Sequence, residues 1–190
     1  MDCNLSELLE ILYRRSFRYD PDHGFKLSSG GTSDIYIDVK KTVLSAEGIM
    51  RVGKAIFDKI KDDNIDGIGG LTLGADPLAY TAAYTSNLSG KPLDVFIVRK
   101  EPKKHGTQRA IEGSLERGAR VVVVDDVITT GGATVKAIES VLAASFTVVK
   151  AVVLVDRQEK NGRQNIEKFC PVESVFTRED LIGFRDKSNS

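Results

Sequence analysis

The sequence of 190 residues is long enough for one domain with a sizeable buried core. Hydrophobic residues make up 41% of it and charged residues 28%, a globular composition that excludes disordered, collagen-like and disulfide-scaffold proteins. The 27 basic and 27 acidic side chains cancel, which disfavours a general nucleic-acid binder, since such proteins usually carry a basic excess.

The first part of the chain predicts a helix, a strand and a second helix. The apolar stripe of residues 5–12 has the spacing of an amphipathic helix. Residues 16–42 are mixed, with turn signals at Pro21, Gly24 and Gly30-Gly31, and within them the alternation of apolar and polar residues over 35–40 predicts a strand. Ser45 is placed to cap a helix whose apolar face runs from Ile49 to Ile60.

From residue 65 onward, strands and helices alternate regularly. We expect strands at 65–69, 93–98, 121–124 and 148–155, helices at 76–86 and 133–145, and a last short helix after the capping-box residues 177–180. Residues 99–118 show no clear periodicity. This alternation predicts an α/β fold, a single domain with an open parallel sheet flanked by helices on both faces.

The cysteines and the hydropathy pattern indicate a soluble, cytoplasmic protein. Cys3 and Cys170 have no metal-ligand spacing, so we expect reduced thiols. No apolar run approaches the roughly 20 residues that span a bilayer. The N-terminus carries acids where a signal peptide carries bases.

The segment from Val121 to Thr134 carries the strongest chemical signal. Asp125 and Asp126 follow a run of valines, and a Thr-Thr-Gly-Gly turn at 129–132 then leads into a helix. Glycine N–H groups, a helix N-terminus and hydroxyl donors suit a phosphate. The two acids would repel a phosphate and suit sugar hydroxyls or a metal ion instead. The segment therefore predicts a sugar-phosphate site; the alternative is a plain strand-to-helix turn capped by Asp and Thr.

Two common nucleotide motifs are absent. No GxxxxGK[ST] occurs, and GxGxxG fails because Thr72 stands where the third glycine would fall. Residues 69–76 form a second Gly-rich turn before a helix, which is either a phosphate loop or an ordinary βα turn.

A basic cluster and a single arginine complete the candidate site. The basic residues suit a pyrophosphate, although a solvated loop or a nucleic-acid patch would look the same; they are Arg99, Lys100, Lys103, Lys104 and His105. Gly106 and Gly113 bracket a polar stretch typical of a mobile lid. Arg157 follows a buried strand and could pair with a planar carboxylate, or with Asp156 or another surface acid.

Two further features are expected to be structural. His23 has no identifiable partner and is expected to be a surface turn residue. The aromatic residues Tyr13, Phe17 and Tyr19 are expected to form core or dimer contacts rather than to stack on a base.

These motifs resemble one known family. Residues 125–134 resemble the phosphoribosyl-pyrophosphate motif of the type I phosphoribosyltransferases. Residues 99–106 are similar to the catalytic loop of the orotate phosphoribosyltransferase family, and residues 25–38 resemble its orotate-site segment. Arg157 matches the orotate-binding arginine of that family. The resemblance spans about residues 20–160 and departs at Ser28, where many members have a lysine; Lys26 lies two residues earlier, on the same face of an extended strand.

The resemblance implies an enzyme that transfers the 5-phosphoribosyl group from phosphoribosyl pyrophosphate to N1 of orotate. Orotidine 5′-monophosphate and pyrophosphate would form in pyrimidine (UMP) biosynthesis. It further implies a Mg²⁺ ion held mainly by substrate, an N-terminal hood from residues 1–42, and a homodimer that shares loop 99–113 across its interface. No nucleic-acid or membrane partner is expected.

The resemblance also assigns roles to single residues. The implied catalytic residues are Lys103, Asp125 and Asp126. The implied phosphoribosyl-pyrophosphate site consists of Arg99, Lys100, Lys103, His105, Asp125, Asp126, Val127, Ile128, Thr129, Thr130, Gly131, Gly132 and Ala133. The implied orotate site consists of Lys26, Thr129 and Arg157.

Two alternative functions stay open. One is a phosphoribosyltransferase for a purine or for uracil, against which residues 25–38 and Arg157 speak. The other is a non-enzymatic regulator that senses phosphoribosyl pyrophosphate; the retained Lys103 speaks against it.

Overall fold

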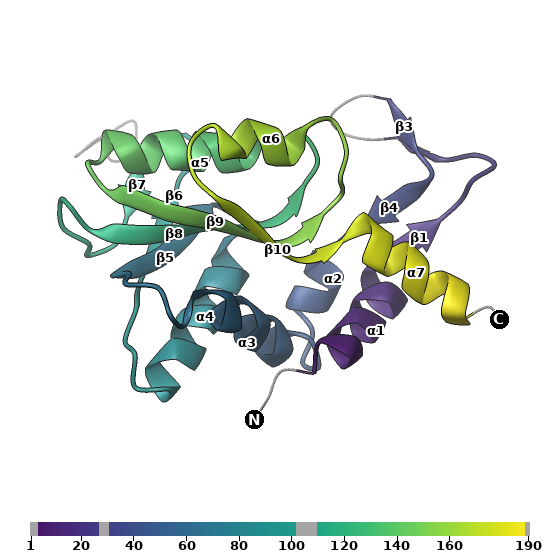
Figure 1. Cartoon of the computed structure of the whole chain (residues 1–190), viewed down its shortest axis with the longest axis horizontal. Helices are drawn as coiled ribbons and strands as arrows, with labels where there is room; N and C mark the ends of the chain where they lie inside the picture. The colour runs from purple at the N-terminus through teal and green to yellow at the C-terminus, as the bar shows by residue number, and fades with distance from the viewer. Residues whose placement is uncertain (1–3, 27–30, 102–109, 189–190) are drawn as a thin grey trace.

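A six-stranded sheet, with strand order β10-β9-β8-β5-β6-β7, is the centre of the computed structural model, which describes residues 4–26, 31–101 and 110–188 (Figure 1). Five strands are parallel: β5 (Gly67–Leu71), β6 (Asp94–Val98), β8 (Arg120–Ile128), β9 (Thr147–Asp156) and β10 (Val172–Thr177). The short β7 (Ile111–Glu112) pairs antiparallel with β6 at one edge. The predicted α/β fold with an open parallel sheet is confirmed.

Helices cover both faces of this sheet. On one face lie α3 (Ile49–Ile60) and α4 (Asp76–Leu88), and on the other lie α5 (Gly132–Ala143) and α6 (Gly162–Glu167) (Figure 1). Successive residues of a strand point to opposite faces. Accordingly, Val122 and Val124 belong to the core beside α3 and α4, whereas Val121 and Val123 belong to the core beside α5. The continuous valine run is therefore buried on both faces, as its composition predicts.

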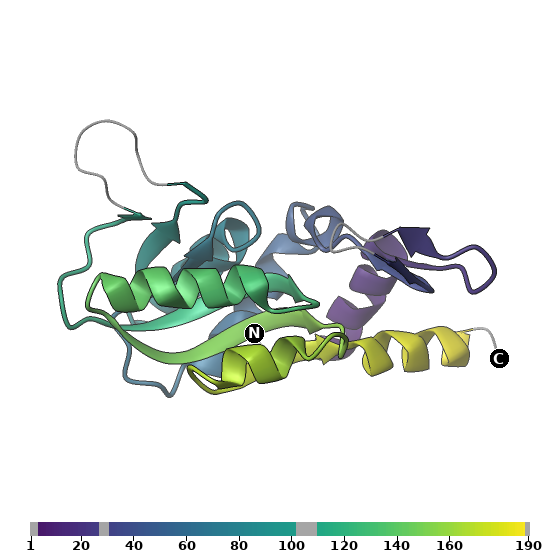
Figure 2. The ribbon, with the colours of Figure 1, turned by 90° about the horizontal axis from the view of Figure 1, so that it is seen from above.

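The N-terminal segment and the last helix gather at the end of the sheet away from β7 (Figure 2). They comprise α1 (Leu5–Ser16), β1 (Phe17–Tyr19), β2 (Phe25–Lys26), β3 (Thr32–Ser33), β4 (Ile35–Ile37), α2 (Lys40–Val43) and α7 (Arg178–Ser188). Tyr13 stacks on Phe17 with ring centroids 5.3 Å apart, and Arg185 lies 3.9 Å over the Tyr19 ring. These aromatic residues pack α1 and β1 against α7, so the expectation that they are structural is confirmed.

Some predicted element boundaries are wrong. Ser45 is not the N-cap of α3, which begins at Ile49; its Oγ accepts from the N–H of Gly48 at 3.1 Å in the preceding turn. Val39 precedes α2 instead of extending β4. The strand predicted at 121–124 continues to Ile128, because the backbone of Asp125 and its successors keeps pairing with β9. Both aspartates therefore lie within β8 rather than after it.

Other elements carried too weak a pattern for prediction. The strands β1, β2, β3 and β7 have two or three residues each, too few to show a period. The sequence analysis also missed α6 and β10. The capping box before α7 is confirmed, because Thr177 and Asp180 each donate a backbone N–H to the other's side chain, at 2.7 and 3.2 Å.

Two single residues, His23 and Cys170, have the environments expected for them. His23 is a surface turn residue as expected, with 85% of its side chain exposed and Nδ1 3.3 Å from Asp20. Cys170 is a free, buried thiol, and burial raises its pKa to about 11. Among the described helices, none combines the length and apolar character needed to cross a membrane.

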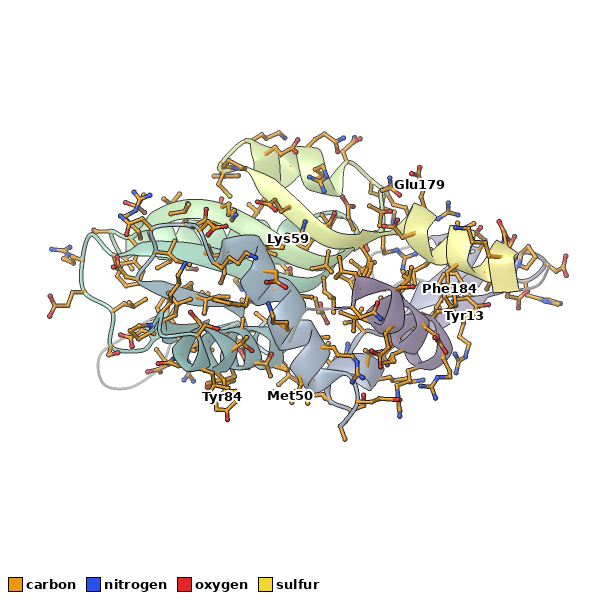
Figure 3. The ribbon with its side chains drawn as sticks, turned by 60° about the horizontal axis from the view of Figure 1, so that its bottom comes forward. Tyr13, Met50, Lys59, Tyr84, Glu179 and Phe184 are labelled. Atoms are coloured by element: carbon orange, nitrogen blue, oxygen red, sulfur yellow. The ribbon has the colours of Figure 1, made fainter. Side chains whose placement is uncertain are left out.

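The outer side of α3 and α4 exposes large apolar side chains. Tyr80, Tyr84 and Leu88 follow one another at helical spacing on α4 and are 53%, 56% and 70% exposed. Met50 of α3 is 52% exposed, and Figure 3 shows it at the same side of the molecule as Tyr84. The two helices thus present one apolar surface to solvent, which we call the α3–α4 face.

Candidate functional site

A cleft of about 480 Å³ opens at the carboxyl edge of the sheet. The second half of β8 and the turn into α5 form one wall, made of residues 125–133. The N-terminal segment supplies another wall through Lys26, Tyr36 and Lys40, and Arg157 adds to it from the end of β9. Ligands of open α/β sheets bind at such an edge.

Asp125 is a buried carboxylate with both oxygens engaged. Its side chain accepts from the Thr134 hydroxyl at 2.6 Å through Oδ2 and from the Asp126 N–H at 3.0 Å through Oδ1. Burial, and then the neighbouring charge of Asp126, raise the pKa of Asp125 to about 7. The Thr134 hydroxyl therefore faces Asp125 and is buried with it.

Asp126 is the more accessible carboxylate, and it lies beside a lysine. Its Oδ2 is 3.8 Å from the Lys40 Nζ, which is also 3.2 Å from Asp38. Burial by itself lowers the pKa of Lys40, but the charges of Asp126 and Asp38 outweigh it and raise that pKa above its usual value. A Cβ on Gly74 would lie 3.0 Å from the Asp126 carboxyl carbon, so the Gly-rich turn before α4 approaches the same carboxylate.

The turn between β8 and α5 needs glycine for its shape. Gly131 has a φ of +75°, and a Cβ there would lie 2.6 Å from the carbonyl oxygen of Gly162. The side-chain amide of Asn165 on α6 donates to the carbonyl oxygen of Thr130 at 3.0 Å, which ties the turn to α6. Residues 129–133 line the cleft and include the first two residues of α5, and the N-terminal end of a helix favours an anion.

Arg157 is a buried cation at the edge of the cleft, only 4% exposed. Its Nη2 donates to the Ser33 hydroxyl at 3.0 Å, and its guanidinium pairs with Glu159 at 3.2 Å. Of the alternative pairings, the one with Asp156 is wrong, because Asp156 pairs with Arg163 at 2.9 Å, whereas a pair with another acid is present, since Arg157 pairs with Glu159. A buried arginine with an edge in a cleft is suited to a planar carboxylate.

The structure does not bring the whole basic cluster to this cleft. Arg99 pairs with Glu112 at 3.1 Å across β6 and β7, and neither Arg99 nor Lys100 is among the residues that line the cleft. The remaining basic residues of the loop lie outside the described residues; they are Lys103, Lys104 and His105. Ser28 lies outside the described residues as well.

Tyr36, which lines the cleft, lies in the segment 25–38 that resembles the orotate-site segment, whereas Lys40, which also lines the cleft, was not predicted as a site residue. Lys40 follows Asp38 by two residues, and this acid–base pair on the polar face of the predicted strand was the available signal. The pairing of Lys40 with Asp126 depends on two segments far apart in sequence, so only the fold reveals it.

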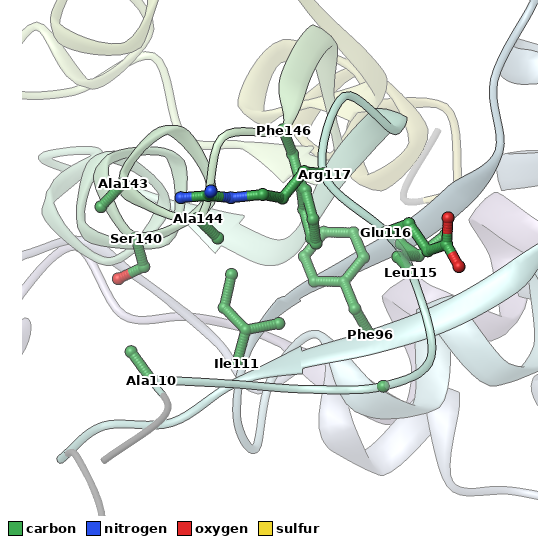
Figure 4. Close-up of a pocket in the computed structure, with 11 residues that line it drawn as sticks. Phe96, Ala110, Ile111, Leu115, Glu116, Arg117, Ser140, Ala143, Ala144 and Phe146 are labelled. Atoms are coloured by element: carbon green, nitrogen blue, oxygen red, sulfur yellow. The ribbon is translucent and has the colours of Figure 1, made fainter. Parts of the chain in front are cut away.

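A second cavity, of about 770 Å³, lies near the amino ends of β8 and β9. Figure 4 shows Phe96, Ile111 and Phe146 gathered around it, with Arg117 at its rim. Its lining is mainly apolar and lacks the facing acids, glycine turn and buried arginine of the cleft at the carboxyl edge. The polar chemistry of the described chain therefore converges on the smaller cleft.

The raised pKa of Asp125 predicts a pH-dependent stability. A carboxyl group whose folded pKa lies above its unfolded value stabilises the fold fully below the unfolded pKa, and that contribution is lost as pH rises toward the folded pKa. For Asp125 this window runs from 3.8 to about 7. The span corresponds to at most about 4 kcal/mol in the free energy of unfolding.

Asp125→Asn removes this titration and should therefore raise the melting temperature more at pH 8 than at pH 4. Thermal unfolding at the two pH values measures the difference. Asp22→Asn in an exposed turn serves as the control and should show little difference. An equal change at both pH values for Asp125→Asn would contradict the role of its burial.

The chain is similar to one known family and to solved structures of its members. The phosphoribosyl transferase domain family matches residues 39–182. An orotate phosphoribosyltransferase of Aquifex aeolicus is 42% identical over 177 residues, which cover 93% of this chain and 96% of the relative. A crystal structure of orotate phosphoribosyltransferase from Mycobacterium tuberculosis with Fe(III) dicitrate has a TM-score of 0.80 at 35% identity, covering 93% of this chain and 98% of that one. The complex of that enzyme with 5-phospho-α-D-ribosyl 1-diphosphate has a TM-score of 0.73 at 30% identity, covering 93% and 90%.

Proposed function

This chain belongs to the orotate phosphoribosyltransferase family, and we propose that the cleft at the carboxyl edge of its sheet is where phosphoribosyl pyrophosphate and orotate react. N1 of orotate loses its proton to solvent and bonds to C1 of the ribose, while the C1–O bond breaks and pyrophosphate leaves with its electron pair; this gives orotidine 5′-monophosphate for pyrimidine biosynthesis. The observation that carries the proposal is the convergence in one cleft of two adjacent carboxylates, a glycine turn and a buried arginine.

The β8 wall is proposed to bind phosphoribosyl pyrophosphate. Residues 129–133 offer N–H and hydroxyl donors for the 5′-phosphate. Asp125 and Asp126 precede them and would accept hydrogen bonds from the ribose hydroxyls. Their negative charge would also stabilise the cationic ring that forms as the C1–O bond breaks. No side chain acts as a nucleophile; positioning and electrostatics supply the rate.

The wall from the N-terminal segment is proposed to bind orotate. Arg157 would pair with the orotate carboxylate, and Lys26, which lines the same cleft, would add a second cation. Thr129 lies on the β8 wall and could donate to the base from there. Residues 1–42 would then act as the hood over the base.

We propose Mg²⁺ as the metal ion of the reaction, held mainly by substrate. No group of three or more His, Cys, Asp or Glu suited to a metal occurs within residues 4–26, 31–101 and 110–188. Asp125 nevertheless has a raised pKa from burial and from Asp126, and a nearby cation would favour its charged form. When bound, the ion would neutralise charge on the pyrophosphate.

A homodimer through the α3–α4 face is part of the proposal. Four large apolar side chains on two neighbouring helices are exposed there, and such surfaces mark contacts with other chains. As the family resemblance implies, the loop 99–113 is proposed to serve the cleft of the second protomer with Lys103 and His105. We further propose a cytoplasmic location, with which the free Cys170 thiol agrees.

The activity is tested by the fall in orotate absorbance with phosphoribosyl pyrophosphate and Mg²⁺. Uracil and the purine bases serve as comparison substrates, since a preference for any of them would replace orotate as the acceptor. Binding of phosphoribosyl pyrophosphate without consumption of any base would instead favour the regulator.

The variant Arg157→Ala is expected to raise the KM for orotate far more than the KM for phosphoribosyl pyrophosphate. A lost charge-assisted hydrogen bond of about 1.5–3 kcal/mol implies a rise of roughly 10- to 150-fold. Initial rates with each substrate varied in turn measure both constants. Arg117→Ala, an exposed arginine at the other cavity, is the control and should change neither. Equal rises in the two KM values would reject the assignment.

A further inference from the structure

The guanidinium of Arg157 is held along one edge by Glu159, two residues further along the chain. Nε donates to Glu159 Oε2 at 3.3 Å, and Nη2 donates to Glu159 Oε1 at 3.2 Å. Only 5% of the Arg157 side chain and 23% of the Glu159 side chain are exposed. A bidentate pair of this kind fixes the plane of the guanidinium as well as balancing its charge.

The N-terminal segment holds the same edge. Nη2 of Arg157 also donates to the Ser33 hydroxyl at 3.0 Å and to the carbonyl oxygen of Ile35 at 3.3 Å. The Ser33 hydroxyl in turn donates to Glu159 Oε1 at 3.4 Å. Protein groups thus occupy Nε and Nη2, whereas Nη1 makes no hydrogen bond to any described residue. Because Arg157 lines the cleft, Nη1 is the donor left for a ligand.

Glu159 is itself fixed by its loop and by a second arginine. Gln158 has a φ of 54°, and its side-chain oxygen accepts a backbone N–H from the start of α7 at 3.2 Å. Arg178 Nε lies 3.9 Å from Glu159 Oε1, the oxygen that also accepts from Arg157 Nη2. The Arg178 Nη2 pairs with both carboxylate oxygens of Asp34, at 3.0 and 2.9 Å. The Glu159 carboxylate therefore lies close to two arginines, Arg157 and Arg178, within a connected network of side chains.

We infer that Glu159 is a positioning residue for the acceptor base, holding the Nε–Nη2 edge of Arg157 so that Nη1 meets the orotate carboxylate. This inference rests on the proposed function. Glu159 acts through Arg157 and does not itself touch the substrate. The negative charge of Glu159 also offsets the positive charge of Arg157, which attracts orotate. The two roles therefore predict opposite results. If Glu159 positions Arg157, its loss weakens orotate binding; if Glu159 only balances the charge, its loss strengthens orotate binding.

The test is Glu159→Gln, which keeps the size of the side chain and removes its charge. The KM for orotate should rise about 10-fold, equivalent to about 1.4 kcal/mol. The KM for phosphoribosyl pyrophosphate and kcat should stay within about twofold of the wild-type values, a split that a general loss of structure would not give. Glu167→Gln makes the same change at the partner of Arg163 on α6 and should alter neither KM.

A double-mutant comparison shows whether Glu159 acts through Arg157. In an Arg157→Ala background, Glu159→Gln should raise the orotate KM no further, because no guanidinium remains to be positioned. Thermal unfolding shows whether Glu159→Gln is folded. If it is not, Glu159→Asp replaces it, because the shorter side chain withdraws the carboxylate from the guanidinium. The same difference between the two KM values is then expected.

Three results overturn the inference: an orotate KM that is unchanged or lower in the folded variant, equal rises for both substrates, or full additivity with Arg157→Ala. The proposed function fails separately, if the wild-type protein shows no consumption of orotate with phosphoribosyl pyrophosphate.

Discussion

Turnover should fall by about a thousandfold or more in the double variant Asp125→Asn/Asp126→Asn, while the protein stays folded. Removal of one group that stabilises transition-state charge lowers kcat by about 100- to 1000-fold, and here both carboxylates beside the reacting ring lose their charge. Folding should survive, because Asn is close in size to Asp and its side-chain oxygen can still accept from Thr134. Steady-state kcat and thermal unfolding of the same preparation measure the two effects.

An adjacent acidic pair elsewhere in the chain provides a matched control. Asp62 and Asp63 follow α3, outside the cleft at the carboxyl edge. Asp62→Asn/Asp63→Asn should retain near-normal turnover, although it removes the contact of Asp63 with Lys150. Near-normal turnover in the folded Asp125/Asp126 variant would remove the carboxylates from the mechanism.

Activity should return when two inactive proteins, Lys103→Ala and Asp125→Asn, are mixed and allowed to exchange subunits. If loop 99–113 serves the neighbouring protomer, a mixed dimer has one site with both lesions and one site with neither. Half of the dimers are mixed and half of their sites are intact, so recovery should reach roughly a quarter of the wild-type rate. The gain is large because each variant alone is expected to be nearly inactive.

The cis arrangement gives the opposite result in the same experiment. Each site of the mixed dimer would then keep one lesion, and no activity would return. Native mass spectrometry confirms that exchange has occurred, and wild-type protein carried through the same mixing controls for loss of activity. No recovery after confirmed exchange would reject the shared site and leave the chemistry of the cleft unchanged.

The cleft could be predicted in large part because its β8 wall is one continuous segment. Residues 125–133 are close in sequence, so local pattern alone groups two acids with a phosphate-binding turn. The place of Arg157 in the cleft could be predicted for a related reason, since parallel strands bring their carboxyl ends to one edge. The hydrogen-bond and ion-pair partners of these residues could not be predicted from the sequence. Pairing of Lys40 with Asp126, and the turning of Thr134 toward Asp125, depend on side-chain directions that no spacing reports.

The sequence by itself determined the alternation of strands and helices, the parallel sheet and the family. Buried valine runs, helical stripes and glycine turns are local features, and each acts through backbone preference and burial over a few residues. Tertiary structure alone decided that β8 continues through both aspartates and that Asp156 pairs with Arg163. It also decided that Glu159 and Ser33 share the edge of Arg157. The physical reason is that short strands and buried charges are stabilised by distant partners: an isolated strand of two or three residues is not stable, and a buried ion is stable only where the fold supplies its counter-charge.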